Sequence, residues 1–213
     1  MQELLTGKRR LPGFRGEWLT KPLGDCLLSR PEYGINAAAV PFSDQFPTYI
    51  RITDISEHGR FVPAPRVSVT AARADKFYLH EGDLVFARTG ASVGKSYLYD
   101  ARDGQLVFAG FMIRVRPDLQ ILNPSFLAAF ALTSSYWNWV RMMSMRSGQP
   151  GINGNEYSRL PVPLPSRPEQ DAIAAILSDM DTEIAALEAK LAKARRVKQG
   201  MMQELLTGRI RLV

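Results

Sequence analysis

A stretch of about forty residues without proline, at positions 169–208, constrains the fold of this chain most strongly. It is rich in Ala, Leu, Glu and Lys, and its apolar residues recur in alternating steps of four and three, as in the seam of a coiled coil. The seam positions are Ile173, Leu177, Met180, Ile184, Leu187 and Leu191. Thr207 and Gly208 supply a typical C-terminal stop. The pattern predicts a long coiled-coil helix over residues 169–208.

The charges of this helix are segregated along its length. Six acids and no base lie from Glu169 to Glu188, whereas five bases and no acid lie from Lys190 to Lys198. The helix macrodipole also favours acids early and bases late, but it acts within the terminal turns, and here the polarity crosses the middle. An antiparallel second copy would place each acidic half against a basic half. The segregation therefore predicts an antiparallel homodimer.

The two ends of the chain carry nearly the same sequence. Residues 1–11 read MQELLTGKRRL and residues 202–212 read MQELLTGRIRL, with identity at nine of eleven positions. Two copies separated by one period are typical of a tandem array. We interpret the chain as one repeat unit, in which residues 1–13 are the tail of a preceding helical repeat and a lead-in.

Residues 14–160 have the pattern of a separate α+β domain. Pro-rich segment 161–168 predicts a stiff, extended connector to the helix, because proline interrupts helices and central strands. A mostly antiparallel or mixed sheet is expected, because short β-type runs alternate with Gly, Pro and Asp. These runs lie at 46–52, 76–79, 83–88, 96–100 and 106–116.

Two helices are expected inside this domain. Asn123 is a suitable N-cap and Pro124 a suitable first helical residue, and apolar residues continue the pattern to Val140. A second, short helix is expected from Pro22 to Leu28.

Composition excludes several classes of protein. The single cysteine, Cys26, rules out an internal disulfide framework and a cysteine-cluster metal site. His58 and His80 lack further ligands at suitable spacing, so no metal is expected. No apolar stretch approaches the roughly 20 residues of a membrane span, and no signal peptide is recognised. We expect a cytoplasmic protein.

The charge distribution favours a polyanionic partner. The net charge is +6, and residues 12–165 carry 16 basic side chains, of which 13 are arginine. Arginine forms planar, bidentate contacts with phosphate and guanine, which lysine cannot form. The alternative is that the arginine content follows genomic G+C content.

Two motifs suggest enzymes but fail in detail. Gly90–Ser96 resembles a P-loop, yet it has three residues between its glycines where a P-loop has four, and it lies between two expected strands. Asn123–Phe126 resembles the Asn-Pro-Pro-Tyr signature of amino-methyltransferases but lacks one proline, and no Gly-rich turn for the methyl donor precedes it. We expect no catalytic site and no cofactor.

Segment 141–155 is suited to contact with DNA. It combines arginine, serine, glutamine and asparagine side chains with four Gly or Pro breaks. Guanidinium and amide groups on a flexible backbone suit base edges and phosphates. An ordinary polar surface loop is the alternative.

Several of these motifs together resemble one family, the specificity subunits of type I restriction-modification systems. The resemblance is carried by Leu-Pro-x-Pro-Leu-Pro with the Glu-Gln…Ile-Ala-x-Ile-Leu-Ser-x-Met-Asp run over 160–181, by Met-Gln-Glu-Leu-Leu-Thr-Gly at the end, and by Arg-Thr-Gly…Gly-Lys over 88–95. It covers nearly the whole chain.

The resemblance implies a division of labour. Family members normally have two target recognition domains, each followed by a conserved helix, and each domain reads one half of a split DNA site. The antiparallel helices set the spacing and dock the methyltransferase (modification) subunits. Methyl transfer and cleavage would belong to modification and restriction subunits, which bring S-adenosylmethionine and ATP.

This chain departs from that pattern, since it has one recognition domain and one complete helix. It could be a half-subunit that forms a homodimer, a fragment of a two-domain parent, or a monomer; the helix charges favour the first. A free-standing DNA methyltransferase is disfavoured because the cofactor motif is absent, and a purely structural coiled-coil adaptor is the third class.

We expect the domain to dock on double-stranded DNA through arginine–phosphate contacts and to read bases in the major groove. The candidate DNA-binding residues are Arg88, Lys95, Arg141, Arg146, Gln149, Asn153 and Asn155, with Arg30, Tyr33 and Arg51 behind them.

Overall fold

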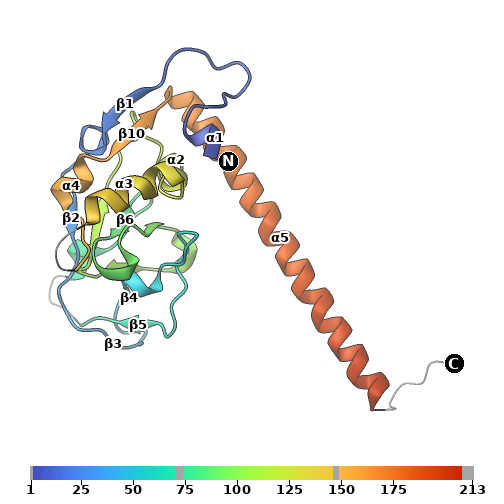
Figure 1. Cartoon of the computed structure of the whole chain (residues 1–213). Coiled ribbons are helices and arrows are strands. Elements are labelled where there is room, and N and C mark those ends of the chain that lie inside the picture. Colours follow the sequence, from blue (N-terminus) through green and yellow to red (C-terminus); the bar gives the residue numbers. More distant parts are fainter. Residues whose placement is uncertain (1, 71–73, 146–148, 208–213) are drawn as a thin grey trace. The chain divides into compact units, whose positions relative to one another are not determined.

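The structure, a computed structural model, describes residues 2–70, 74–145 and 149–207. The chain divides into two units, Met1–Ala174 and Ala175–Val213 (Figure 1). The strands are β1 (Leu19–Pro22), β2 (Glu32–Tyr33), β3 (Val40–Pro41), β4 (Thr48–Ile50), β5 (Val67–Ser68), β6 (Leu84–Ala87), β7 (Ser96–Leu98), β8 (Leu106–Phe108), β9 (Met112–Val115) and β10 (Pro161–Leu164). The α-helices are α1 (Gln2–Leu5), α2 (Pro124–Phe130), α3 (Ser134–Ser144), α4 (Gly154–Ser158) and α5 (Arg167–Leu206). Short 3-10 helices are η1 (Leu23–Cys26), η2 (Ile52–Asp54), η3 (Ala74–Phe77), η4 (Gly90–Ser92) and η5 (Ala101–Asp103).

Three sheets organise the first unit. One has the order β2-β9-β6-β7 and is antiparallel throughout; the second, β3-β5-β4-β8, is mixed because β4 and β8 run parallel. The third is the antiparallel pair β1-β10. The predicted α+β class, with mixed and antiparallel sheets and a long C-terminal helix, is confirmed.

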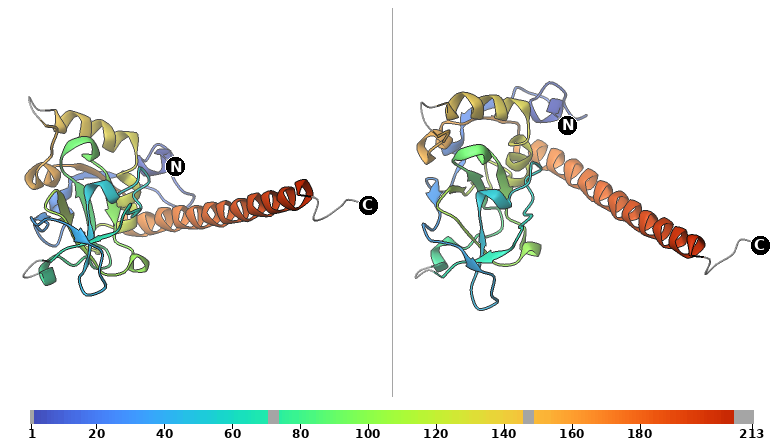
Figure 2. Two further views of the ribbon diagram at one scale, coloured as in Figure 1. Left: turned by 90° about the horizontal axis from the view of Figure 1, so that it is seen from below. Right: turned by 60° about the horizontal axis from the view of Figure 1, so that its bottom comes forward.

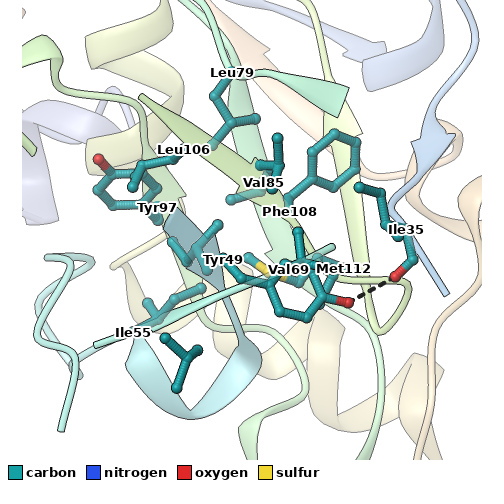
Figure 3. Packing of buried hydrophobic residues seen from close by; sticks show 14 residues of the cluster. Ile35, Tyr49, Ile55, Val69, Leu79, Val85, Tyr97, Leu106, Phe108 and Met112 are labelled. Atoms are coloured by element: carbon teal, nitrogen blue, oxygen red, sulfur yellow. Dashed lines mark hydrogen bonds between the residues drawn. The ribbon is translucent and has the colours of Figure 1, made fainter. Parts of the chain in front are cut away.

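The two four-stranded sheets share one hydrophobic core (Figure 3). Val85 of β6 and Met112 of β9 contribute from one sheet, and Tyr49 of β4 and Phe108 of β8 from the other. The Tyr49 hydroxyl is satisfied inside this core, because it donates to the Ile35 carbonyl at 2.8 Å. Burial of tyrosine with its hydroxyl paired avoids the cost of an unsatisfied polar group.

The opposite face of β6 packs on an aromatic layer. Successive strand residues point to opposite faces, so Phe86 turns away from Val85 and stacks on Tyr157, with ring centroids 4.7 Å apart. Tyr136 of α3 lies 6.1 Å from Phe86, and its hydroxyl donates to the Gly94 carbonyl at 2.6 Å. This layer fixes α3 and α4 beside the end of β6.

Asn123 caps α2 as predicted, since its side chain accepts hydrogen bonds from the backbone N–H groups of Ser125 and Phe126. The apolar pattern that continues to Val140 belongs to two helices, however. The chain turns at Ala131–Thr133, and the Thr133 side chain caps α3. Thr133 is a good N-cap, and this signal was hidden inside a continuous apolar pattern.

Three other local predictions need correction. The run 76–79 is not a strand: residues 74–77 form η3, and Tyr78 makes a single bridge to Val107. The run 106–116 is two strands, β8 and β9, separated by a turn at Gly110 that lies close to the Ile35 carbonyl. The helix expected from Pro22 to Leu28 is the shorter η1.

The Pro-rich segment is extended over Pro161–Leu164, where it pairs as β10 with β1, but its last two residues, Arg167 and Pro168, already belong to α5. In a two-stranded sheet both strands are edge strands. The prolines at positions 161 and 163 therefore remove no hydrogen bond to a second neighbouring strand. Its partner β1 ends in proline as well, and Pro22 lies opposite Pro161.

The helix predicted over 169–208 is present as α5, which runs from Arg167 to Leu206 without interruption (Figure 2). Its first turn is anchored within the first unit. The Gln170 side chain accepts from the Asn123 N–H at 2.8 Å and donates to the Ile121 carbonyl at 3.0 Å. Buried Glu169 forms two hydrogen bonds with Arg10, at 2.6 and 2.7 Å.

Candidate DNA-binding surface

The connection between β6 and β7 is a tight, closed loop. Gly94 has a φ of 90° and donates its N–H to the Ala87 carbonyl at 2.9 Å. A Cβ at Gly94 would lie 2.6 Å from a methyl of Val140 in α3, so the loop backbone rests directly on that helix. The loop joins two antiparallel strands, and the interpretation of Gly90–Ser96 as a structural connection rather than a P-loop agrees with this geometry.

This loop is joined to segment 149–155 by backbone hydrogen bonds. The Gly90 N–H donates to the Pro150 carbonyl at 3.0 Å, and the Ile152 N–H donates to the Arg88 carbonyl at 2.9 Å. Thr89 and Gly151 form an antiparallel bridge between these bonds. Two segments that the sequence suggested separately therefore form one surface.

Arg88 lies at the centre of that surface. Its guanidinium carbon stands 5.1 Å from the ring centre of exposed Tyr33, and its Nε donates to the Gly110 carbonyl at 3.2 Å. Stacking of this kind orients a guanidinium group without neutralising its charge. The Tyr33 hydroxyl is itself held, because it accepts the Gly154 N–H at 3.0 Å.

Two further predicted residues lie beside this pair. Gln149 is exposed, and its amide nitrogen is 3.3 Å from the position of a Cβ on Gly90. Asn155 is exposed in the first turn of α4, next to the Gly154 that holds Tyr33. We call Tyr33, Arg88, Gln149 and Asn155 the Arg88 cluster.

Sequence reasoning missed one neighbour of this cluster. Phe111 is exposed, and its carbonyl accepts the Arg88 N–H at 3.0 Å. The exposure of Phe111 was not predicted because this residue belongs to an apolar run that predicts one buried strand. An aromatic residue next to a glycine in such a run, as in Gly110-Phe111, was the available signal of an exposed turn.

Three predicted residues have structural contacts that account for their positions. Arg51 forms hydrogen bonds with the buried carboxylate of Asp54, at 2.8 and 3.0 Å. Lys95 binds the Glu57 carboxylate at 2.8 Å. The Asn153 side chain caps α4 by accepting the Glu156 N–H at 2.9 Å.

The remaining candidates are Arg141, Arg30 and Arg146. Arg141 is exposed on α3 and forms a hydrogen bond with the Asn138 side chain. Arg30 is exposed in the segment before β2. Arg146 lies outside the described residues.

Residues 2–70, 74–145 and 149–207 offer neither a metal-binding cluster nor a membrane-spanning helix. In these ranges no group of three or more His, Cys, Asp or Glu side chains is placed to hold a metal ion. No helix in the same ranges has the length and apolarity that crossing a membrane requires.

Comparison with known proteins identifies the family. The model of the type I restriction modification DNA specificity domain matches residues 43–196. The chain belongs to this family. The match includes the Arg88 cluster apart from Tyr33, and it includes the first thirty residues of α5.

Relatives of the specificity family resemble this chain over part of their length. It is 28% identical over 135 residues to a putative type I restriction enzyme MjaX specificity subunit of Methanocaldococcus jannaschii, covering 62% of this chain and 32% of that protein. It is 23% identical over 199 residues to the StySPI specificity subunit of Salmonella potsdam, covering 91% and 42%. This chain therefore spans less than half of each relative. Specificity subunits are the non-catalytic DNA-recognition components of type I systems, which agrees with the prediction that this chain is not an enzyme.

Solved structures share the fold. The HsdS subunit from Thermoanaerobacter tengcongensis matches with a TM-score of 0.58 and 20% identity, over 95% of this chain and 50% of that one. The type I restriction-modification S subunit from M. genitalium matches with a TM-score of 0.63 and 16% identity, over 92% and 47%.

Proposed function

We propose that this chain is a DNA specificity subunit that reads one half of a bipartite site and works as an antiparallel homodimer with methyltransferase subunits. The observation that carries the proposal is the Arg88 cluster, in which two loops from distant parts of a specificity domain hold an oriented arginine beside exposed amide side chains.

Within the cluster, the side chains fit different parts of DNA. Arg88 suits a guanine edge or a phosphate, since its guanidinium plane is set by Tyr33. Among the described residues, no protein acceptor contacts its two terminal nitrogens, which leaves those donors for DNA. Gln149 and Asn155 carry amides, which suit adenine.

Self-association is supported by the helix surface. Met180, Ile184, Leu187 and Leu191 lie on one heptad seam and are each about half exposed. Ile173 and Leu177, by contrast, are buried in their own chain, so these two predicted seam residues are not open to a second copy. An antiparallel partner covers the exposed part of the seam and pairs the acidic half of one helix with the basic half of the other.

Methyltransferase docking is proposed for the same helix pair. The sides of α5 away from the seam carry most of its charged residues and stay available when two copies pair. Methyl transfer then belongs to the docked subunits, with S-adenosylmethionine as their cofactor.

Methylome sequencing tests the proposal in a host that expresses this chain with its methyltransferase partner. A bipartite palindromic methylation motif is expected, because two identical domains related by a two-fold axis read identical half-sites. An asymmetric motif would contradict the homodimer, and an absent motif would contradict the function.

Two measurements discriminate the competing classes. Isothermal titration of the purified chain with S-adenosylmethionine separates a methyltransferase from a specificity subunit, since tight binding is expected of the enzyme alone. A gel-shift assay with the methyltransferase partner present separates the specificity subunit, which retards target DNA, from a coiled-coil adaptor, which does not.

A further inference from the structure

The two copies of the terminal repeat have the same local structure. Gln2–Leu5 forms α1, and the corresponding residues 203–206 form the last turn of α5. In each copy the threonine hydroxyl donates to the glutamine carbonyl four residues earlier: Thr6 to Gln2 at 2.8 Å, and Thr207 to Gln203 at 2.6 Å.

Their surroundings are opposite. Leu5 is 0% exposed, whereas the corresponding Leu206 is 83% exposed. An identical helical turn is thus buried at one end of the chain and uncovered at the other. Burial of Leu5 shows that this leucine can pack into an apolar site, and Leu206 offers the same side chain for the same kind of contact.

The first copy occupies a defined site on the recognition domain, where α1 lies against α2 (Figure 1). The Ser134 hydroxyl at the start of α3 donates to the side-chain carbonyl of Gln2. Gly7, which has a φ of 72°, sits on the Trp18 ring, 3.2 Å from where its Cβ would be, and Trp18 packs edge-on against Phe126. We call this the α1 site.

A four-residue helix does not form by itself, because helix nucleation is costly. The α1 site therefore holds α1 in place by contacts rather than by intrinsic helix propensity. A second segment with the same sequence offers the same contacts and already has its helical shape.

We propose that the α1 site also accepts residues 203–207 of a second copy of the chain, in exchange for its own α1. This inference rests on the proposed antiparallel pair. When two copies of α5 overlap fully, the last turn of one lies beside the first turn of the other. That first turn contains Glu169, which is paired with Arg10, five residues after α1.

Energetics favour exchange inside the dimer and not between free chains. An exchanged element makes the same contacts as the original, so the two arrangements differ little in free energy. The chain's own α1 is tethered, which gives it a high effective concentration. A second copy competes only when the helix pair brings its last turn to the site at a similar effective concentration.

Cysteine cross-linking tests the inference with full-length chains. One preparation carries Ser134→Cys and the other Gln203→Cys, the counterpart of the Gln2 that contacts Ser134. After mixing and mild oxidation, a disulfide between the two chains is expected. Native Cys26 is a poor competitor, because it is buried and burial raises the pKa of its thiol.

Matched variants make the result specific. Gln2→Cys with Ser134→Cys in one chain is the positive control, and Gln199→Cys, one turn earlier on α5 and outside the repeat, is the negative control. Leu5→Ala in the Ser134→Cys chain should raise the yield several-fold by loosening the original occupant. Leu206→Ala in the partner should lower it several-fold, and this residue is exposed, so the free chain stays folded.

Sedimentation of the same samples separates the two levels of the proposal. A dimer without cross-linking at position 203, or with equal cross-linking at 199 and 203, overturns the exchange and leaves the homodimer standing. A monomer overturns the self-association, and the exchange with it.

Discussion

Substitution of Leu187 by glutamate is expected to dissociate the proposed dimer. Leu187 lies at the middle of α5 and is 56% exposed, so in a fully overlapped antiparallel pair it lies near the two-fold axis and close to its own copy. Full burial of such a side chain contributes about 1.5–3 kcal/mol, and roughly half of that, about 1 kcal/mol, is still to be gained on pairing.

The magnitude follows from the number of seam residues. Four half-exposed residues per chain, Met180, Ile184, Leu187 and Leu191, give on the order of 8 kcal/mol for the pair, against an association cost of about 4–15 kcal/mol. Each seam residue therefore matters. Leu187→Glu removes about 1 kcal/mol from each chain and adds about 1 kcal/mol of carboxylate repulsion, which together raise the dissociation constant about 150-fold.

Sedimentation velocity over a dilution series measures this change. The matched control is Thr182→Glu, which adds the same charge on the opposite side of the helix, at an exposed position whose hydroxyl bonds back to the Ser178 carbonyl. The control should dimerise like the parent chain. Equal dissociation constants for Leu187→Glu and the parent, or equal losses in both variants, would refute the seam.

Four further outcomes are expected. Arg88→Ala should weaken target binding by about 1–3 kcal/mol in a gel-shift titration at fixed salt, whereas the exposed Arg102→Ala should not; equal effects would argue against the cluster. Glu169→Gln should lower the free energy of unfolding by about 2 kcal/mol in urea, less than the 3–5 kcal/mol of a fully buried pair because Arg10 stays partly hydrated. Gly34→Ala should prevent soluble expression, because its Cβ would lie 2.2 Å from a backbone oxygen of β8; a stable variant would contradict the backbone described. Burial raises the pKa of Tyr136 well above its usual value. The stability that this group contributes is fully present below pH 10, and above pH 10 the free energy of unfolding should fall by about 1.4 kcal/mol per pH unit. Tyr136→Phe should flatten that slope in urea titrations at pH 9–11.

Sequence patterns predicted the elements whose signals are local. The long helix was placed within two residues at each end, because proline and heptad spacing both act over neighbouring positions. Asn123 was recognised as a cap for the same reason. The strand expected at 76–79 failed because an apolar aromatic run does not distinguish a strand from a 3-10 turn that packs its rings, such as Phe77, on a core.

The candidate site depended on contacts that no local pattern contains. Arg88 and Gln149 were both selected from composition, yet their meeting requires the bridge between Thr89 and Gly151, which lie more than sixty residues apart. Residue type alone could not separate Arg88, which stacks on exposed Tyr33, from Arg51, which is committed to buried Asp54.

The bonds that join the β6–β7 loop to segment 149–155 have a consequence for how such domains change over time. They run from backbone to backbone, through Gly90, Pro150, Ile152 and the carbonyl of Arg88. The shape of the surface is therefore largely indifferent to which side chains it displays. Under the proposed DNA readout, mutation can exchange the displayed side chains, and with them the preferred base pairs, while the frame persists. On that proposal, new target preferences are accessible by single steps that pass through folded proteins.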